Sequence, residues 1–218
     1  MQYIESIKLV YIHIPKTGGS FIEKNLSLLN KNFFNDNTHF GGHHTIETLK
    51  KRINFDISYK YFTIVRNPYY RMISIYNYLK KTEKRNNGDR NEWKYLGEPN
   101  NFSEFVYSIY DKYKNNKMTD INNLNMHYVQ QFRYTIQKKD EGEVQCQILK
   151  YENLDVDFKK LIESYKKNKE IYNFLYKNIY EKINIKDNYN LDDLCINDIN
   201  MINEIYEKDF LIFGYDKY

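Results

Sequence analysis

The segment Leu9–Leu26 constrains the fold most, because it predicts a β-strand, a tight turn and a helix in immediate succession. Branched apolar residues alternate with Tyr and His up to Pro15, which is the pattern of a strand that ends at a proline. Gly18 and Gly19 then allow the backbone to turn tightly or to approach a ligand closely. Apolar residues return at helical spacing from Ile22 onward.

The turn between this strand and this helix has the composition of an anion-binding site. A helix N-terminus carries unpaired N–H groups and partial positive charge, and Lys16 adds a full charge just before the glycines. Ser20 and Glu23 have the spacing of a capping box. The lysine precedes the glycines, so the turn differs from the Walker motif. It is a candidate phosphate site, and the alternative is a plain turn whose glycines serve geometry alone.

A second strand–turn–helix unit follows. Tyr59 to Val65 predicts a buried strand, and Tyr69 to Lys81 predicts a helix. Arg66 leaves the carboxyl end of that strand, where ligands bind in open α/β sheets, and its planar fork suits a phosphate. Ser74, within the helix, can donate a hydroxyl. The alternative is that Arg66 and Arg71 are surface cations and that Ser74 fills space between helix and sheet.

The rest of the chain adds a third strand and more helices. Val144 to Leu149 is a candidate strand, followed by a helix from Val156 to about Tyr165. Phe102 to Tyr113 has helical apolar spacing, and a last helix is expected at Ile196 to Phe210, ending before Gly214. This alternation predicts an α/β fold with a parallel sheet flanked by helices.

The length suits a single domain over residues 1–218. Residues 82–101 are charged, rich in Asn and interrupted by Gly and Pro, so an irregular insertion is expected there. No apolar run reaches membrane-spanning length and no signal peptide precedes the first strand, so a cytoplasmic protein without a membrane span is expected. Cys146 and Cys195 have neither a disulfide nor a metal-site spacing.

The net charge of +4 and the pI near 8.7 suit anionic small ligands. This charge is too weak and too dispersed to indicate nucleic acid as a partner.

The sequence Pro-Lys-Thr-Gly-Gly-Ser at 15–20 resembles the 5′-phosphosulfate loop of the sulfotransferases that use 3′-phosphoadenosine 5′-phosphosulfate. The likeness is greatest to the branch with heparan sulfate 2-O-sulfotransferase and its bacterial relatives. Arg-Asn-Pro at 66–68, followed by Arg71 and Ser-Ile-Tyr at 74–76, resembles the 3′-phosphate motif of that family. The resemblance implies the P-loop-like sulfotransferase fold. It also implies a set of residues that hold the cofactor: Lys16, Thr17, Gly18, Gly19 and Ser20 around the 5′-phosphosulfate, and Arg66 and Ser74 on the 3′-phosphate.

Three further segments resemble related bacterial enzymes. His127 with Gln130 and Gln131 resembles a His-x-x-Pro-Gln element, although Gln130 stands where the proline would be. Residues 149–154 and 206–215 are also similar to segments of those enzymes, whereas 82–101 has no counterpart.

Sulfuryl transfer to a hydroxyl needs an in-line acceptor, a stabilised leaving phosphate and a base. The resemblance places Lys16 beside the leaving phosphate. Gly-His-His-Thr at 42–45 resembles the family's Gly-His-x-Ser/Thr element, which implies that His43 is the base. His44 is the fallback and His39 a distant third. Each histidine could instead be a loop residue that bonds to backbone.

No metal is expected, because lysine, arginine and helix N-termini neutralise the charge and the histidines lack metal-site spacing. Thr45 is a candidate cap for a helix that begins at Ile46.

The resemblance implies a carbohydrate acceptor, a glycan or glycoconjugate, and adenosine 3′,5′-bisphosphate as the product. The alternatives are a nucleotide kinase of P-loop type and a non-catalytic nucleotide-binding module. The absent Walker order and the lack of a clear magnesium-binding acidic residue at a strand end count against the kinase. The sequence leaves the oligomeric state open.

Overall fold

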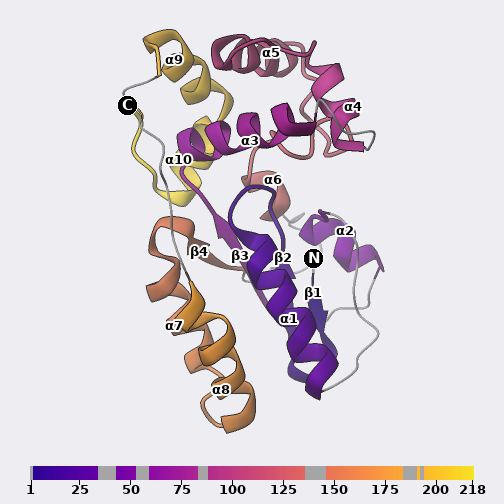
Figure 1. Ribbon diagram of the computed structural model, residues 1–218, viewed down its shortest axis with the longest axis vertical. Coiled ribbons are helices and arrows are strands. Elements are labelled where there is room, and N and C mark those ends of the chain that lie inside the picture. The colour runs from indigo at the N-terminus through magenta and orange to yellow at the C-terminus, as the bar shows by residue number, and fades with distance from the viewer. Residues whose placement is uncertain are drawn as a thin grey trace. The chain divides into compact units, whose positions relative to one another are not determined.

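The computed structural model describes residues 2–33, 43–52, 59–82, 88–135, 146–183, 191 and 194–218. The chain divides into two compact units, which are Met1–Val65 with Tyr134–Lys186 and Arg66–Arg133 with Asp187–Tyr218 (Figure 1). Each unit has its own cluster of buried apolar side chains. The expected single domain over 1–218 stays a prediction.

The first unit contains a four-stranded sheet in the order β1-β2-β3-β4. Strands β2, β3 and β4 are parallel, and β1 pairs with β2 in the antiparallel direction. The predicted α/β fold with a parallel sheet is therefore confirmed, and an antiparallel edge strand is added to it. The strands are β1 Gln2–Ile4, β2 Leu9–Ile12, β3 Lys60–Val65 and β4 Cys146–Lys150.

The parallel register brings the carboxyl ends of three strands to one edge of the sheet. Ile12 lies opposite Thr63, and Val65 lies opposite Lys150. The chain leaves this edge into three segments: the loop before α1, the start of the second unit after β3, and the turn after β4.

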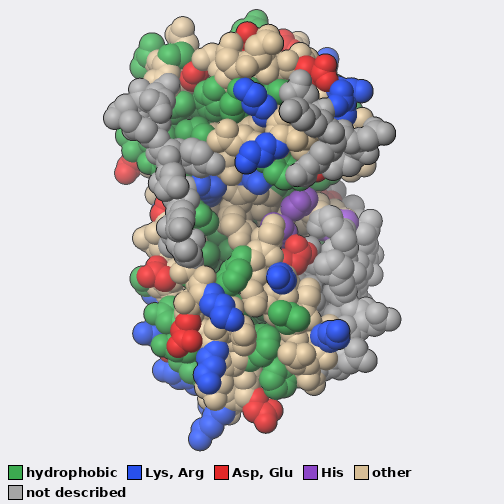
Figure 2. Space-filling view, in the orientation of Figure 1, with side chains coloured by type: hydrophobic (Ala, Val, Ile, Leu, Met, Phe, Trp, Pro, Cys, Tyr) green, Lys and Arg blue, Asp and Glu red, His purple; other side chains and the backbone are tan. Residues whose placement is uncertain are grey.

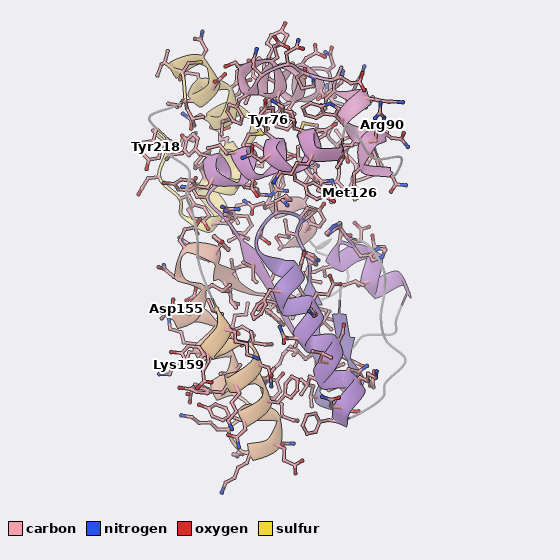
Figure 3. All side chains as sticks on the ribbon, viewed as in Figure 1. Tyr76, Arg90, Met126, Asp155, Lys159 and Tyr218 are labelled. Carbon is pink, nitrogen blue, oxygen red and sulfur yellow. The ribbon has the colours of Figure 1, made fainter. Side chains whose placement is uncertain are left out.

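Helices pack on the sheet of the first unit. Apolar side chains of α1, α7 and α8 form one buried cluster with alternate residues of the strands. In α7, Leu154 and Phe158 are buried, whereas Asp155 and Lys159 lie on the exposed side (Figure 3). The helical elements of this unit are η1 Glu5–Ile7, α1 Gly19–Phe33, α2 Ile46–Arg52, η3 Tyr151–Asn153, α7 Leu154–Glu163, α8 Lys169–Asn178 and η4 Tyr180–Lys182.

In the second unit, helices pack against one another: α3, α5 and α9 lie side by side (Figure 1). The short helix α6 (Phe132–Thr135) lies where the chain returns to the first unit. The helices of this unit are α3 Pro68–Thr82, α4 Gly88–Tyr95, α5 Phe102–Lys114, α9 Ile196–Ile205 and α10 Glu207–Phe213.

The prediction of an irregular insertion at 82–101 is wrong for its central part, which is helix α4. The reason is tertiary packing. Trp93 and Leu96 are buried in the core of the second unit, and Glu92 is buried beside His127.

Helix ends follow the predicted signals in two places. The Thr48 N–H donates to Thr45 Oγ1 at 3.0 Å, which confirms Thr45 as the cap of α2. Gly214 adopts a left-handed conformation and ends α10. The expected last helix is instead two helices, because Tyr206 leaves helical geometry between α9 and α10.

Lys and Arg are scattered among acidic and apolar side chains on the face that Figure 2 shows. This arrangement agrees with the inference from sequence that the positive charge is dispersed.

Candidate functional site

The loop between β2 and α1 has an unusual backbone. Lys16 has a φ of 66° and Gly18 a φ of 81°, and Thr17 between them is not in the left-handed region. A left-handed conformation at a lysine costs about 1 kcal/mol. Left-handed residues are one component of the backbone nests that direct N–H groups toward an anion. The loop shares this component at Lys16 and Gly18.

Both glycines of the loop are required by close packing. A Cβ on Gly18 would lie 2.7 Å from a ring carbon of Tyr151, which follows β4. A Cβ on Gly19 would lie 2.0 Å from Tyr11 Oη and 2.4 Å from His13 Cδ2. The glycines thus serve the geometry of the turn, and they bring the first turn of α1 directly onto the strand.

Thr17 and Ser20 differ in what their hydroxyls can do. Thr17 is fully buried, and its hydroxyl donates to the Ile14 carbonyl at 2.9 Å, so it closes the turn. Its contribution to a ligand would come from the backbone. Ser20 is exposed in the first turn of α1. The predicted capping box is wrong, because α1 already begins at Gly19 and the Glu23 carboxylate contacts His13 instead.

A pair formed by a buried histidine and a half-buried carboxylate supports this loop from within. His13 Nδ1 lies 2.8 Å from Glu23 Oε2, and His13 is buried. Burial raises the pKa of Glu23, but hydrogen bonds, among them the one with His13, lower it below its usual range. Glu23 is therefore ionised at neutral pH and fixes the orientation of the His13 ring.

His43 is held against the same histidine. Its Nδ1 lies 2.9 Å from the His13 carbonyl oxygen, and the two rings meet edge to face with centroids 4.6 Å apart. A carbonyl oxygen only accepts, so Nδ1 is the donor in this contact. The neutral form of His43 therefore carries its lone pair on Nε2, which is the tautomer of a base that acts through Nε2.

Sequence reasoning does not identify the roles of Tyr11 and Tyr151 in this region, and it assigns Glu23 to a capping box rather than to His13. The signal for Glu23 is its position four residues after Gly19, which places it on the helix face that meets the strand. No comparable signal identifies Tyr151, because its contact with Gly18 joins residues far apart in the sequence.

The second predicted phosphate motif lies in the second unit. Asn67 caps α3, since its side-chain oxygen accepts from the Tyr69 N–H at 3.0 Å, and Pro68 is the first helical residue. Arg66 is buried directly before this cap, and Ser74 is half-buried within α3. Arg-Asn-Pro is thus the junction where a strand ends and a helix begins.

Arg71 has a structural role that corrects the surface-cation alternative. Its side chain is buried and donates to the carbonyls of Val129 at 3.0 Å and His127 at 2.8 Å. It ties α3 to the segment that begins at His127. Arg71 and Arg66 are therefore both buried arginines, and Arg71 is already engaged with backbone.

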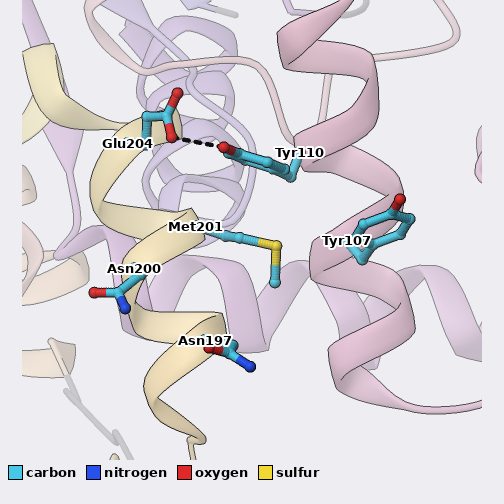
Figure 4. Close-up of a pocket in the computed structure, with 6 residues that line it drawn as sticks. All are labelled: Tyr107, Tyr110, Asn197, Asn200, Met201 and Glu204. Carbon is cyan, nitrogen blue, oxygen red and sulfur yellow. Dashed lines mark hydrogen bonds between the residues drawn. The ribbon is translucent and has the colours of Figure 1, made fainter.

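A separate hollow of about 320 Å³ lies between α5 and α9 (Figure 4). None of the predicted site residues lines it, and its Tyr110 donates to Glu204 at 2.7 Å. It is lined by Tyr107, Tyr110, Asn197, Asn200, Met201 and Glu204.

His39 lies outside the described residues, as do Gly41 and Gly42. Within the described part of the chain, no group of three or more His, Cys, Asp or Glu side chains is arranged to hold a metal ion. None of the helices in that part combines the length and apolar character needed to cross a bilayer.

The parallel sheet, the glycine-containing loop at its carboxyl edge and the capped Arg-Asn-Pro junction define an α/β protein with two strand–turn–helix units. A family model described as the sulfotransferase family matches residues 3–216, and the chain belongs to this family. This confirms the family that the motifs indicate, whereas the heparan sulfate 2-O-sulfotransferase branch stays a prediction. Searches of curated proteins and of solved structures returned no match.

Proposed function

We propose that the protein moves a sulfuryl group from 3′-phosphoadenosine 5′-phosphosulfate to a hydroxyl group by in-line transfer, leaving adenosine 3′,5′-bisphosphate. Family membership supports sulfuryl transfer to a hydroxyl in general. The observation that carries the choice of donor is the loop between β2 and α1, with Lys16 and Gly18 in left-handed conformations before a helix N-terminus. A loop of this form suits a phosphate group.

Lys16 stabilises the charge that grows on the leaving phosphate oxygen. A cation in a fixed position, close to the N-terminal end of α1, is worth more there than in water, because it needs no reorganisation during the reaction. The buried Thr17 hydroxyl holds the turn closed around this lysine. Gly18, Gly19 and Ser20 complete the loop, through their backbone N–H groups and the exposed Ser20 hydroxyl.

His43 takes the proton of the acceptor hydroxyl through Nε2. The support for this role is the Nδ1 contact with the His13 carbonyl, which selects the required tautomer. When Nε2 gains a proton, the ring becomes cationic and its bond to that carbonyl becomes stronger. His44 is the fallback, and it is half-buried next to His43 in the sequence.

Arg66 and Ser74 hold the 3′-phosphate. The arginine fork can donate two parallel hydrogen bonds to phosphate oxygens, and the serine hydroxyl can add a third. The position of Arg66 between the end of β3 and the cap of α3 supports this assignment. We further propose a carbohydrate as the acceptor, on the basis of the family resemblance of the motifs.

The test is to incubate the protein with sulfur-labelled donor and a panel of glycans. We expect label in a glycan and one equivalent of adenosine 3′,5′-bisphosphate. The Lys16→Ala variant should lose this activity. Lys8→Ala is a matched control, because Lys8 is also left-handed but its ammonium group pairs with Glu5. Consumption of ATP without sulfate transfer would contradict the proposal in favour of a kinase, and tight product binding without transfer would indicate a binding module.

A further inference from the structure

The side-chain amide of Gln131 forms two hydrogen bonds with the backbone of Arg66. The Arg66 N–H donates to Gln131 Oε1 at 2.9 Å, and Gln131 Nε2 donates to the Arg66 carbonyl at 2.8 Å. Gln131 has 0% of its surface exposed, and its Nε2 also lies 3.5 Å from Asp209 Oδ2, so its amide contacts only protein groups and does not reach solvent. These two hydrogen bonds satisfy the backbone N–H and C=O of Arg66 just after β3 ends. Both groups are buried there, and leaving them unpaired would cost free energy.

Asp209 in turn holds Gln131. Its carboxylate accepts from the backbone N–H of Gln131 at 2.8 Å and of Phe132 at 2.9 Å. Asp209 is fully buried and belongs to α10, so a helix near the end of the chain fixes the orientation of the glutamine.

The rest of the segment around Gln131 is fixed as well. Arg71 of α3 donates to two of its carbonyls, and Glu92 of α4 accepts from the backbone N–H of His127. The Tyr206 hydroxyl donates to the Tyr128 carbonyl. Side chains from several elements therefore pin residues 127–132, and Gln131 is the member that contacts Arg66.

Gln130 has the same residue type and similar burial but a different task. Its Nε2 donates to the Ile205 carbonyl at 3.2 Å, and its Oε1 accepts from Arg133 Nε at 2.8 Å. These bonds hold the segment at the position where the resembling element has a proline. Gln130 makes none of the bonds to Arg66 described above, which makes it a natural control for Gln131.

We propose that Gln131 is a positioning residue that sets the location of the Arg66 guanidinium for the 3′-phosphate of the nucleotide. This inference rests on the proposed function, in which Arg66 binds that phosphate. A guanidinium that binds a phosphate has to be placed within a fraction of an ångström. Hydrogen bonds to the backbone of the same arginine are the most direct way to fix its position. Gln131 itself touches no ligand, because it is fully buried.

The experiment compares the binding of adenosine 3′,5′-bisphosphate and adenosine 5′-monophosphate by calorimetry. Wild type should prefer the bisphosphate. Gln131→Met keeps the size of the side chain and removes both bonds to Arg66, so bisphosphate affinity should fall at least about tenfold. Monophosphate affinity should change less than about threefold. Gln130→Met should leave the ratio of the two affinities as in wild type, even if it lowers the melting temperature.

A double variant separates a positioning role from general destabilisation. If Gln131 acts through Arg66, the Arg66→Ala/Gln131→Met protein should bind the bisphosphate no more weakly than Arg66→Ala alone. If Gln131→Met does not fold, Gln131→Asn, which is one methylene too short to make both bonds, replaces it.

Two failures are distinguishable. An unchanged ratio in Arg66→Ala would refute Arg66 as the ligand of the 3′-phosphate and with it the inference about Gln131, whereas the proposed function itself fails only if labelled sulfate is not transferred. A reduced ratio in Arg66→Ala with a normal ratio in Gln131→Met would overturn the positioning role alone. Equal losses in the Gln131→Met and Gln130→Met variants would also overturn it.

Discussion

Asp209 is a fully buried carboxylate whose replacement by asparagine should change the pH dependence of stability. Burial raises the pKa of Asp209 from 3.8 to about 6, although the N–H groups of Phe132 and Gln131 and the charge of Arg71 oppose this rise. The folded protein therefore binds this proton more tightly than the unfolded chain. Stability must fall as the pH rises between about 4 and 6, and the cost is constant above that window.

The size of the effect follows from the two pKa values. They differ by about two, and each pKa unit corresponds to about 1.4 kcal/mol, so ionised Asp209 costs about 3 kcal/mol at neutral pH relative to its protonated form. The measurement is urea unfolding of wild type and Asp209→Asn at a series of pH values from 4 to 7.5. Relative to the variant, wild type should lose about 3 kcal/mol of unfolding free energy across this range.

Parallel stability curves would refute this reasoning, because they would mean that Asp209 has the same pKa in both states. If the unfolding free energy of wild type increased relative to the variant with rising pH, the two N–H donors, rather than burial, would dominate the pKa of Asp209. The other carboxylates titrate in both proteins and cancel in the difference.

Three further predictions concern the loop and its base. Gly19→Ala should lower the unfolding free energy by about 3 kcal/mol, because the added Cβ would overlap Tyr11 Oη. In urea titrations, the double variant Gly19→Ala/Tyr11→Phe should recover part of this loss. Lys16→Ala should reduce turnover by orders of magnitude. The melting temperature should stay nearly unchanged, because alanine has the same cost as lysine in the left-handed conformation. Near-normal turnover would remove the role of Lys16. His43→Ala should bind adenosine 3′,5′-bisphosphate normally but lower kcat by about 10²–10⁴ and remove the limb of the pH–rate profile that the base contributes. Unchanged turnover would remove the role of His43.

Local patterns in the sequence predict the two strand–turn–helix units well. β2 and α1 follow from alternation, a proline and two glycines, and the helix predicted at Tyr69 to Lys81 is α3. Thr45 and Gly214 mark helix ends for the same reason. In each case the physical cause acts between residues a few positions apart, so it is visible in the sequence.

Other features arise only from tertiary contacts. The antiparallel strand β1 and the helical part of the 82–101 segment depend on what packs against them, and Trp93 anchors the latter. The Thr17 hydroxyl looks like a ligand donor in the sequence but faces Ile14 in the fold.

The candidate site also has features that the sequence determines and features that only the tertiary structure decides. The sequence alone determines which residue types stand in the loop, at His43 and at Arg66. The tertiary structure decides which partners orient them: Glu23 through His13 for the loop, the His13 carbonyl for His43, and Gln131 with Asp209 for Arg66. Most of these contacts join residues separated by tens of positions, and no local periodicity specifies such pairs, because they form only when the helices and strands pack.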